Sequence, residues 1–226
     1  MSNILKTKEK GILIVISGPS GAGKGTIIKE LLKRVNNVWL SVSMTSRAIR
    51  KGDIPNVSYY FVSKEEFEER IEKGIFLEYA TYNGNYYGTP KDKIVEKLNA
   101  GFDVILEIEI QGALKVKELI PDAIFIFIMP PSMGELRKRL VHRGTDSADK
   151  ILSRFKRAYQ EINEVTKYNY VVINDEVDSA VNKVKAILSS ERCRVDRIEE
   201  VYLNNEEEEI HELLVDKELI NEERVI

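Results

Sequence analysis

The sequence predicts an α/β fold in which a parallel β-sheet is flanked by helices. Three observations support this prediction. Apolar runs rich in β-branched residues alternate with helical patterns along most of the chain, as in proteins built on a parallel sheet. A glycine-rich turn joins the first apolar run to the first helix. The alternation is interrupted once, over Ser43–Asn85, which predicts an inserted α+β lobe.

Five apolar runs are predicted to form strands. They are Ile12–Ser17, Val38–Ser43, Asp103–Ile110, Ala123–Met129 and Tyr170–Asn174. Every apolar run is far shorter than a bilayer span, and the amino-terminal segment lacks the apolar stretch of a secretory signal. We therefore expect no membrane partner and a cytoplasmic location.

Helical patterns fill the intervals between these runs. Two helix starts carry a serine followed three residues later by a glutamate, Ser63 with Glu66 and Ser132 with Glu135. Such pairs satisfy amides at the start of a helix. The first helix passes through Ile27–Leu32, and the others are predicted at about 63–73, 90–100, 111–119, 132–142, 150–166 and 177–191.

Charge is unevenly distributed along the 226 residues, although 34 Lys and Arg against 37 Asp and Glu give a net charge of only −3. Residues 195–226 hold 12 acidic and 3 basic residues, a net charge of −9, which leaves +6 on the preceding chain. A mildly basic body suits phosphate ligands. No motif indicates a nucleic-acid partner. The single cysteine, Cys193, and the two histidines exclude an internal disulfide and a Cys/His zinc cluster.

The motif with the most chemistry is Gly18-Pro-Ser-Gly-Ala-Gly23-Lys24, between a predicted strand and a predicted helix. This is the spacing of a phosphate-binding loop. Backbone amides and the helix N-terminus attract a phosphate, and Lys24 neutralises its charge. Gly25 stands where the general motif has a Ser or Thr that contacts Mg²⁺, so either Thr26 or a water supplies that oxygen.

Glu107 and Glu109 are candidate acidic groups near the loop. On a strand their side chains would point to the same face. Two carboxylates on a buried strand are costly without a cation or hydrogen-bond donors. We interpret Glu107 as a metal-orienting group acting through water. The alternative is a pair of salt-bridged glutamates at the strand end.

Seven motifs in order resemble the guanylate kinase family: GPSGAGKGT, SVSMTSRAIRKGD, FLEYATYNGNYYGTP, LEIEIQGA, FIMPPS, RLVHRGTDS and VVINDE. The resemblance covers a domain over residues 11–192. It implies a P-loop NTPase fold with a five-stranded parallel sheet, a GMP-binding lobe at about 43–89 and a short lid at about 139–154. It also implies transfer of the γ-phosphoryl group of ATP to GMP with Mg²⁺ as cofactor, and dGMP as a further acceptor. Residues 193–226 form an acidic extension outside it.

The resemblance assigns two arginines and two tyrosines to the GMP phosphate, where guanidinium forks and phenol hydroxyls supply donors. They are Arg47, Arg50, Tyr59 and Tyr87. Guanine offers N1–H and an exocyclic amine, which suit the carboxylate of Glu78, and Ser43 and Thr89 match base-contacting hydroxyls. Glu109 falls where the family has a second acidic guanine contact, which is usually the shorter Asp.

The resemblance assigns the loop to ATP. The residues are Gly18, Pro19, Ser20, Gly21, Ala22, Gly23, Lys24, Gly25 and Thr26, with Asn174 near the adenine. Lys24 and three arginines of the lid, Arg139, Arg143 and Arg154, are the predicted catalytic residues, because cations stabilise the charge on a transferring phosphoryl group.

Two other functions compete with a GMP kinase. A GMP-binding module without ATP chemistry typically lacks a working phosphate loop, which is present here. A kinase for another monophosphate is disfavoured by Glu78, Ser43 and Thr89. The oligomeric state, monomer or homo-oligomer, stays open. In the tail, the apolar spacing fits an amphipathic helix, and a solvated extension fits equally.

Overall fold

The computed structural model describes residues 5–7, 10–50, 52–82, 84–142 and 148–201. The chain divides into two units, a larger one over Glu9–Ile187 and a smaller one made of residues 1–8 and 188–226.

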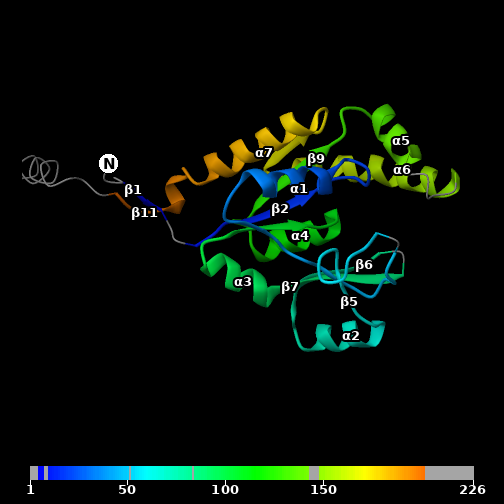
Figure 1. Cartoon of the computed structure of the whole chain (residues 1–226), viewed down its shortest axis with the longest axis horizontal. Helices are drawn as coiled ribbons and strands as arrows, with labels where there is room; N and C mark the ends of the chain where they lie inside the picture. Colours follow the sequence, from blue (N-terminus) through cyan, green and yellow to red (C-terminus); the bar gives the residue numbers. More distant parts are fainter. Residues whose placement is uncertain (1–4, 8–9, 51, 83, 143–147, 202–226) are drawn as a thin grey trace, which may run out of the picture. The chain divides into compact units, whose positions relative to one another are not determined.

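A five-stranded parallel sheet forms the centre of the larger unit (Figure 1). In order across the sheet, its strands are β10 (Tyr170–Ile173), β9 (Ile124–Met129), β2 (Leu13–Ser17), β8 (Asp103–Glu107) and β3 (Val38–Leu40). All neighbouring pairs are parallel, which confirms the predicted fold class. Because the carboxyl ends of all five strands lie at one edge, the residues that follow the strands gather there.

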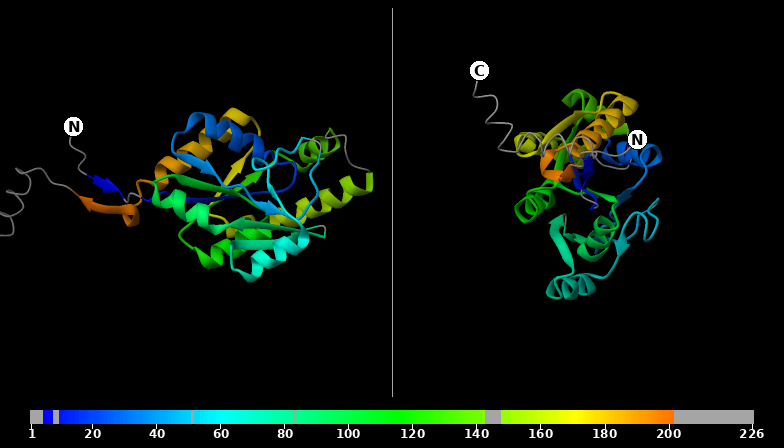
Figure 2. Two further views of the ribbon diagram at one scale, coloured as in Figure 1. Left: turned by 60° about the horizontal axis from the view of Figure 1, so that its bottom comes forward. Right: turned by 90° about the vertical axis from the view of Figure 1, so that its left-hand side faces the viewer.

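Helices cover both faces of this sheet. On one face, α3 (Lys91–Asn99) and α4 (Ile110–Leu119) bury Ile94, Ala113 and Val116 against alternate residues of the strands. On the opposite face lie α1 (Lys24–Arg34) and α7 (Val177–Glu191) (Figures 1 and 2). Both faces of the strands are therefore apolar, which is why the strands are continuous apolar runs in the sequence.

Two further helices, α5 (Met133–His142) and α6 (Ala148–Ile162), pack together through Leu136, Leu140 and Ala158. A 3₁₀ turn, η1 (Asn163–Lys167), continues α6 towards β10.

The inserted lobe has its own sheet, in the order β5 (Tyr60–Phe61), β4 (Met44–Thr45), β7 (Asn85–Pro90) and β6 (Phe76–Tyr82), with α2 (Lys64–Glu72) beside it. Phe67 of α2 stacks between Phe76 and Tyr86, at centroid distances of 4.4 and 5.1 Å. This aromatic stack gives the lobe an apolar core of its own.

The predicted helix starts are confirmed. The Ser63 hydroxyl accepts a hydrogen bond from the Glu66 amide at 3.0 Å, and Ser132 accepts one from the Glu135 amide at 3.1 Å.

Two strand predictions are wrong at their carboxyl ends. The run 38–43 is not one strand, because β3 ends at Leu40 and the chain enters the sheet of the lobe at Met44. The run 103–110 ends as a strand at Glu107, and Glu109 is the N-cap of α4. The premise that Glu107 and Glu109 share one strand face is therefore wrong. Apolar Ile108 and Ile110 concealed the change from strand to helix, because both are buried.

The smaller unit contains a two-stranded antiparallel sheet that the sequence did not predict. Its strands are β1 (Leu5–Thr7) and β11 (Ile198–Val201), and β11 follows the 3₁₀ turn η2 (Val195–Arg197). The amphipathic pattern of the tail lies in residues 202–226, outside the described residues. Within the described part of the chain, every helix is too short or too polar to cross a bilayer.

Candidate active site

The predicted phosphate loop lies between the central strand β2 and α1. At Gly18, with φ of 145°, a Cβ would lie 2.2 Å from the Ile128 carbonyl oxygen, and at Gly23, with φ of 94°, it would lie 2.3 Å from Asn174 Nδ2. Only glycine fits both the backbone and the space at these positions. The first turn of α1 itself contains no acidic residue, so no side chain of that turn offsets the positive potential of the helix N-terminus.

Lys24 is the first residue of α1, and its ammonium group bends back over the loop. Lys24 Nζ donates to the Gly18 carbonyl at 2.5 Å and to the Pro19 carbonyl at 3.3 Å. The side chain therefore holds a positive charge over the loop, as the motif predicts.

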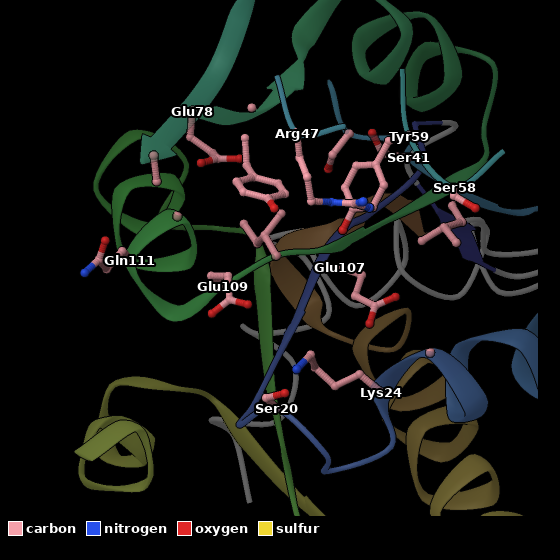
Figure 3. Close-up of a pocket in the computed structure, with 18 of the residues that line it drawn as sticks. Ser20, Lys24, Ser41, Arg47, Ser58, Tyr59, Glu78, Glu107, Glu109 and Gln111 are labelled. Carbon is pink, nitrogen blue, oxygen red and sulfur yellow. The ribbon is translucent and has the colours of Figure 1, made fainter. Parts of the chain in front are cut away.

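A cavity of about 620 Å³ opens from the loop towards the lobe, within the usual size of small-molecule sites. Figure 3 shows Ser20 and Lys24 on one wall, Glu78, Arg47 and Tyr59 on the opposite wall, and Glu107 and Glu109 between them. The predicted residues that line it are Ser20, Gly21, Gly23, Lys24, Gly25, Thr26, Ser43, Arg47, Arg50, Tyr59, Glu78, Tyr87, Glu107, Glu109 and Arg154.

Six of the site residues predicted from the sequence, all within the part of the chain that the structure describes, do not line this cavity: Gly18, Pro19, Ala22, Thr89, Arg139 and Asn174. Asn174 is 3% exposed and its Nδ2 donates to the Ala22 carbonyl at 2.7 Å. Arg139 donates through Nη2 to the Asn174 carbonyl at 3.1 Å. Asn174 therefore supports the loop from behind, whereas Arg139 contacts the end of β10 and Glu135 outside the cavity. Arg143 lies outside the described residues.

Two predicted phosphate ligands are ordered by a residue that the sequence reasoning missed, Asp53. Arg47 is 8% exposed, and its Nη1 lies 2.9 Å from Asp53 Oδ2. The same oxygen accepts a hydrogen bond from the Arg50 amide at 2.7 Å. Hydrogen bonds from Arg47 and from the Arg50 amide lower the pKa of Asp53. The only sign of this role in the sequence was the position of Asp53 three residues after Arg50.

Two tyrosines complete this wall. The rings of Tyr59 and Tyr87 meet edge to face with centroids 5.9 Å apart, and the guanidinium of Arg47 lies 5.4 Å from the Tyr59 centroid. Burial raises the pKa of Tyr59 to about 12. Its hydroxyl therefore keeps its proton at neutral pH and is available as a donor.

Glu78 on β6 is a buried carboxylate, with 7% of its surface exposed. Burial raises its pKa, while a hydrogen bond from Thr89 and the charge of Lys115 oppose that rise. Thr89 is fully buried and its Oγ1 donates to Glu78 Oε1 at 2.6 Å. In the structure the Thr89 hydroxyl is thus engaged by Glu78.

Glu107 ends β8 beside the start of α1. Both of its carboxylate oxygens lie 3.7 Å from the position of a Cβ built on Gly25. The described residues hold no group of three or more metal-ligating side chains. Mg²⁺ in nucleotide sites is bound by one or two protein oxygens together with phosphates and water, so Thr26 and Glu107 fit that pattern.

Arg157 on α6 is a cavity residue that the sequence reasoning also missed. It lies one helical turn after Arg154, and residues at this spacing share a helix face. That spacing was a usable signal. Gln111 and Gly112, at the start of α4, are further lining residues that were not predicted.

A phosphate loop on the central strand of a parallel sheet, facing a cluster of arginines and tyrosines whose chemistry suits a second phosphate, is typical of a P-loop protein of the phosphotransferase class. The guanylate kinase family model matches residues 10–191. The chain belongs to the guanylate kinase family, as the sequence motifs predicted.

Similar proteins agree with this membership. The chain is 60% identical over 208 residues to a guanylate kinase of Clostridium tetani, covering 92% of this chain and 100% of that protein. It is 54% identical to a guanylate kinase of Caldanaerobacter subterraneus, covering 91% of this chain and 100% of that protein. The crystal structure of guanylate kinase from Anaplasma phagocytophilum matches with a TM-score of 0.73 at 34% identity, covering 87% of this chain and 93% of that one.

Proposed function

We propose that this protein transfers the γ-phosphoryl group of ATP to GMP and forms ADP and GDP. One observation carries the proposal: the cavity has a phosphate loop on one wall and a buried carboxylate beside an Arg-Tyr cluster on the other. Two phosphate-bearing ligands can thus face each other across it. The relatives named guanylate kinase support the same reaction.

On the ATP side, residues 18–26 bind the phosphates, and Lys24 stabilises the negative charge that develops on the transferring group. Arg139, Arg143 and Arg154 are proposed to stabilise the same charge. Asn174 is proposed to act at the nucleotide through the loop that it supports, close to the adenine end. Phosphoryl transfer needs positioning and positive charge more than covalent help.

On the GMP side, four residues bind the phosphate of GMP: Arg47, Arg50, Tyr59 and Tyr87. Glu78 accepts hydrogen bonds from the N1–H and the amine of guanine, with Ser43 and Glu109 at the edge of the base and Thr89 behind Glu78. A buried acceptor left without its partner is costly, so AMP should be rejected strongly.

Mg²⁺ is the proposed cofactor. Thr26 and Glu107 would hold it, Glu107 through water, together with the ATP phosphates. When bound, the ion supplies neutralisation of the phosphate charge. The reaction belongs to purine nucleotide metabolism and GMP recycling, in the cytoplasm where both substrates occur, and dGMP is a second acceptor.

The test is an ADP-release assay with GMP, dGMP, AMP, CMP and UMP as acceptors, with and without Mg²⁺. We expect turnover with GMP and dGMP, none without Mg²⁺, and poor turnover with the other three. Folded protein that binds GMP without turnover would favour a binding module, and a preference for another acceptor would favour a different monophosphate kinase.

Lys24→Ala tests the division of the cavity into two sites. Turnover should fall by about 10³-fold or more because the charge on the transferring group loses its cation, while GMP affinity is retained. Lys29→Ala is the matched control, since Lys29 is an exposed lysine of the same helix. Equal loss of GMP binding and turnover in Lys24→Ala would contradict the assignment.

A further inference from the structure

The buried carboxylate of Glu78 lies against the first turn of α4, at Gly112. A Cβ built on Gly112 would lie 2.7 Å from Glu78 Oε2, 3.1 Å from Cδ and 3.6 Å from Oε1. All three atoms of the carboxylate group are therefore close to this one position. In Figure 3, Glu78 and Gln111, the residue before Gly112, lie in the same part of the cavity.

Gly112 is an unfavourable residue for its local structure. It is the third residue of α4 and has no positive φ, so the helix itself does not require glycine. Glycine is among the weakest helix formers and alanine is the strongest. The requirement for glycine comes instead from the neighbouring carboxylate, since the nearest atoms to its missing side chain all belong to Glu78.

The physical consequence of adding a side chain at this position can be worked out from burial. Helix α4 cannot retreat, because Ala113 and Val116 are fully buried against the sheet. Rotation of the carboxylate about Cγ–Cδ moves the oxygens but leaves Cδ 3.1 Å from the added Cβ, which is still too close. The Glu78 carboxylate must therefore move, and the 2.6 Å hydrogen bond from Thr89 would be lengthened or broken.

We infer that Gly112 is a positioning residue for base selection: its missing side chain leaves the space in which the Glu78 carboxylate is held to accept the base. The inference rests on the proposed function, because it takes Glu78 as the acceptor for guanine. It extends the specificity site to Gly112 on a different element, α4, which acts on base binding by positioning Glu78.

Gly112→Ala tests this inference. The KM for GMP should rise about tenfold or more, as expected when hydrogen bonds to a charged acceptor are displaced. The KM for ATP should stay within about twofold, because the three nearest atoms to the added Cβ all belong to Glu78. A purely structural role would instead disturb both substrates alike. The matched control is Gly134→Ala in α5, where the nearest atom, Ser132 Oγ, is 3.7 Å from the added Cβ.

Making Gly112→Ala in a Glu78→Asp protein separates the contact between the added Cβ and Glu78 from other effects of the substitution. In Glu78→Asp the carboxylate is one methylene shorter and withdraws from Gly112, so adding Gly112→Ala should raise the KM for GMP by less than about twofold further. If Gly112→Ala alone does not fold, the same Glu78→Asp change should restore folding. Additive effects, no restoration, or an unchanged KM for GMP in Gly112→Ala would each overturn the inference.

Glu78→Gln distinguishes this inference from the proposed function. If Glu78→Gln raises the KM for GMP and Gly112→Ala does not, only the role of Gly112 fails. If Glu78→Gln leaves the KM for GMP unchanged, the assignment of Glu78 to guanine fails. The proposed guanine site and the role of Gly112 then both lose their basis.

Discussion

Arg157 on α6 connects Glu109, the N-cap of α4, to Glu161 on its own helix. Arg157 Nη2 lies 3.2 Å from Glu109 Oε2, and Arg157 Nε lies 2.7 Å from Glu161 Oε1. Burial raises the pKa of Glu161, and the nearby charge of Glu109 adds to the rise, while Arg157 opposes it. The guanidinium group of Arg157 thus links the helix that carries Arg154 to the start of α4.

Replacing Arg157 with Met should lower kcat/KM for GMP about two- to fivefold, because the partly exposed ion pair with Glu109 contributes about 1 kcal/mol or less. Methionine keeps most of the apolar length of the side chain and removes the charge. Steady-state kinetics measures the change. Lys156→Met is the control, since Lys156 is the exposed neighbour on the same helix and should behave as the parent protein. Equal effects of the two substitutions would contradict the role of Arg157.

Asp53→Ala should raise the KM for GMP about tenfold with a smaller change in kcat. The loss removes the acceptor that holds both the Arg47 guanidinium and the Arg50 amide, and misplaced cations bind phosphate poorly. Asp53→Asn keeps an acceptor oxygen and should recover part of the affinity. If the alanine and asparagine variants bind GMP equally well, the ordering role of Asp53 is wrong.

Asp53 should also make the free energy of unfolding depend on pH in the acid range. Arg47 and the Arg50 amide hold the pKa of Asp53 below its ordinary value in the folded protein. The stabilisation is therefore present above the ordinary pKa of about 3.9 and is lost as the pH falls further. Denaturant unfolding below about pH 4 should show a steeper loss of stability for the parent than for Asp53→Asn.

Tyr59→Phe should change the stability of the protein in alkali. The pKa of Tyr59 is raised from 10.0 to about 12, so the folded state disfavours the phenolate. Stability from this group is complete below pH 10 and is lost between about pH 10 and 12. The free energy of unfolding should therefore fall more steeply across this range in the parent than in Tyr59→Phe. Parallel slopes for the two proteins would rule out this source of pH dependence.

Asn174→Ala should affect the ATP side of the cavity selectively. The substitution leaves the Ala22 carbonyl without its 2.7 Å donor and opens space behind Gly23. We expect a loss of about 1–3 kcal/mol in the free energy of unfolding and a clear rise in the KM for ATP. GMP affinity, measured by titration, should change little. Asn174→Asp places a carboxylate against the same carbonyl and should be more damaging, and a mild effect would indicate a different role for Asn174.

The local sequence determined the elements and one half of the site. The strands β2 and β9 are apolar on both faces, so their identity and the parallel sheet follow from the residues alone. The phosphate loop could also be located, because its function depends on the backbone of consecutive residues such as Gly18 and Gly23 and on Lys24 beside them. The boundary at Glu107 could not be placed, because the apolar pattern continues from the strand into α4.

Tertiary structure alone decided which residues support the predicted ones. Three such contacts join separate segments: Asp53 with Arg47, Arg157 with Glu109, and Gly112 with Glu78. The packing of α4 on β6 brings the last pair together. A sequence shows which side chains have suitable chemistry, whereas the burial of Glu78 and the space left by Gly112 exist only after the chain has folded. The sequence by itself therefore determined the kind of chemistry, and the packing of distant segments decided where each charge is held.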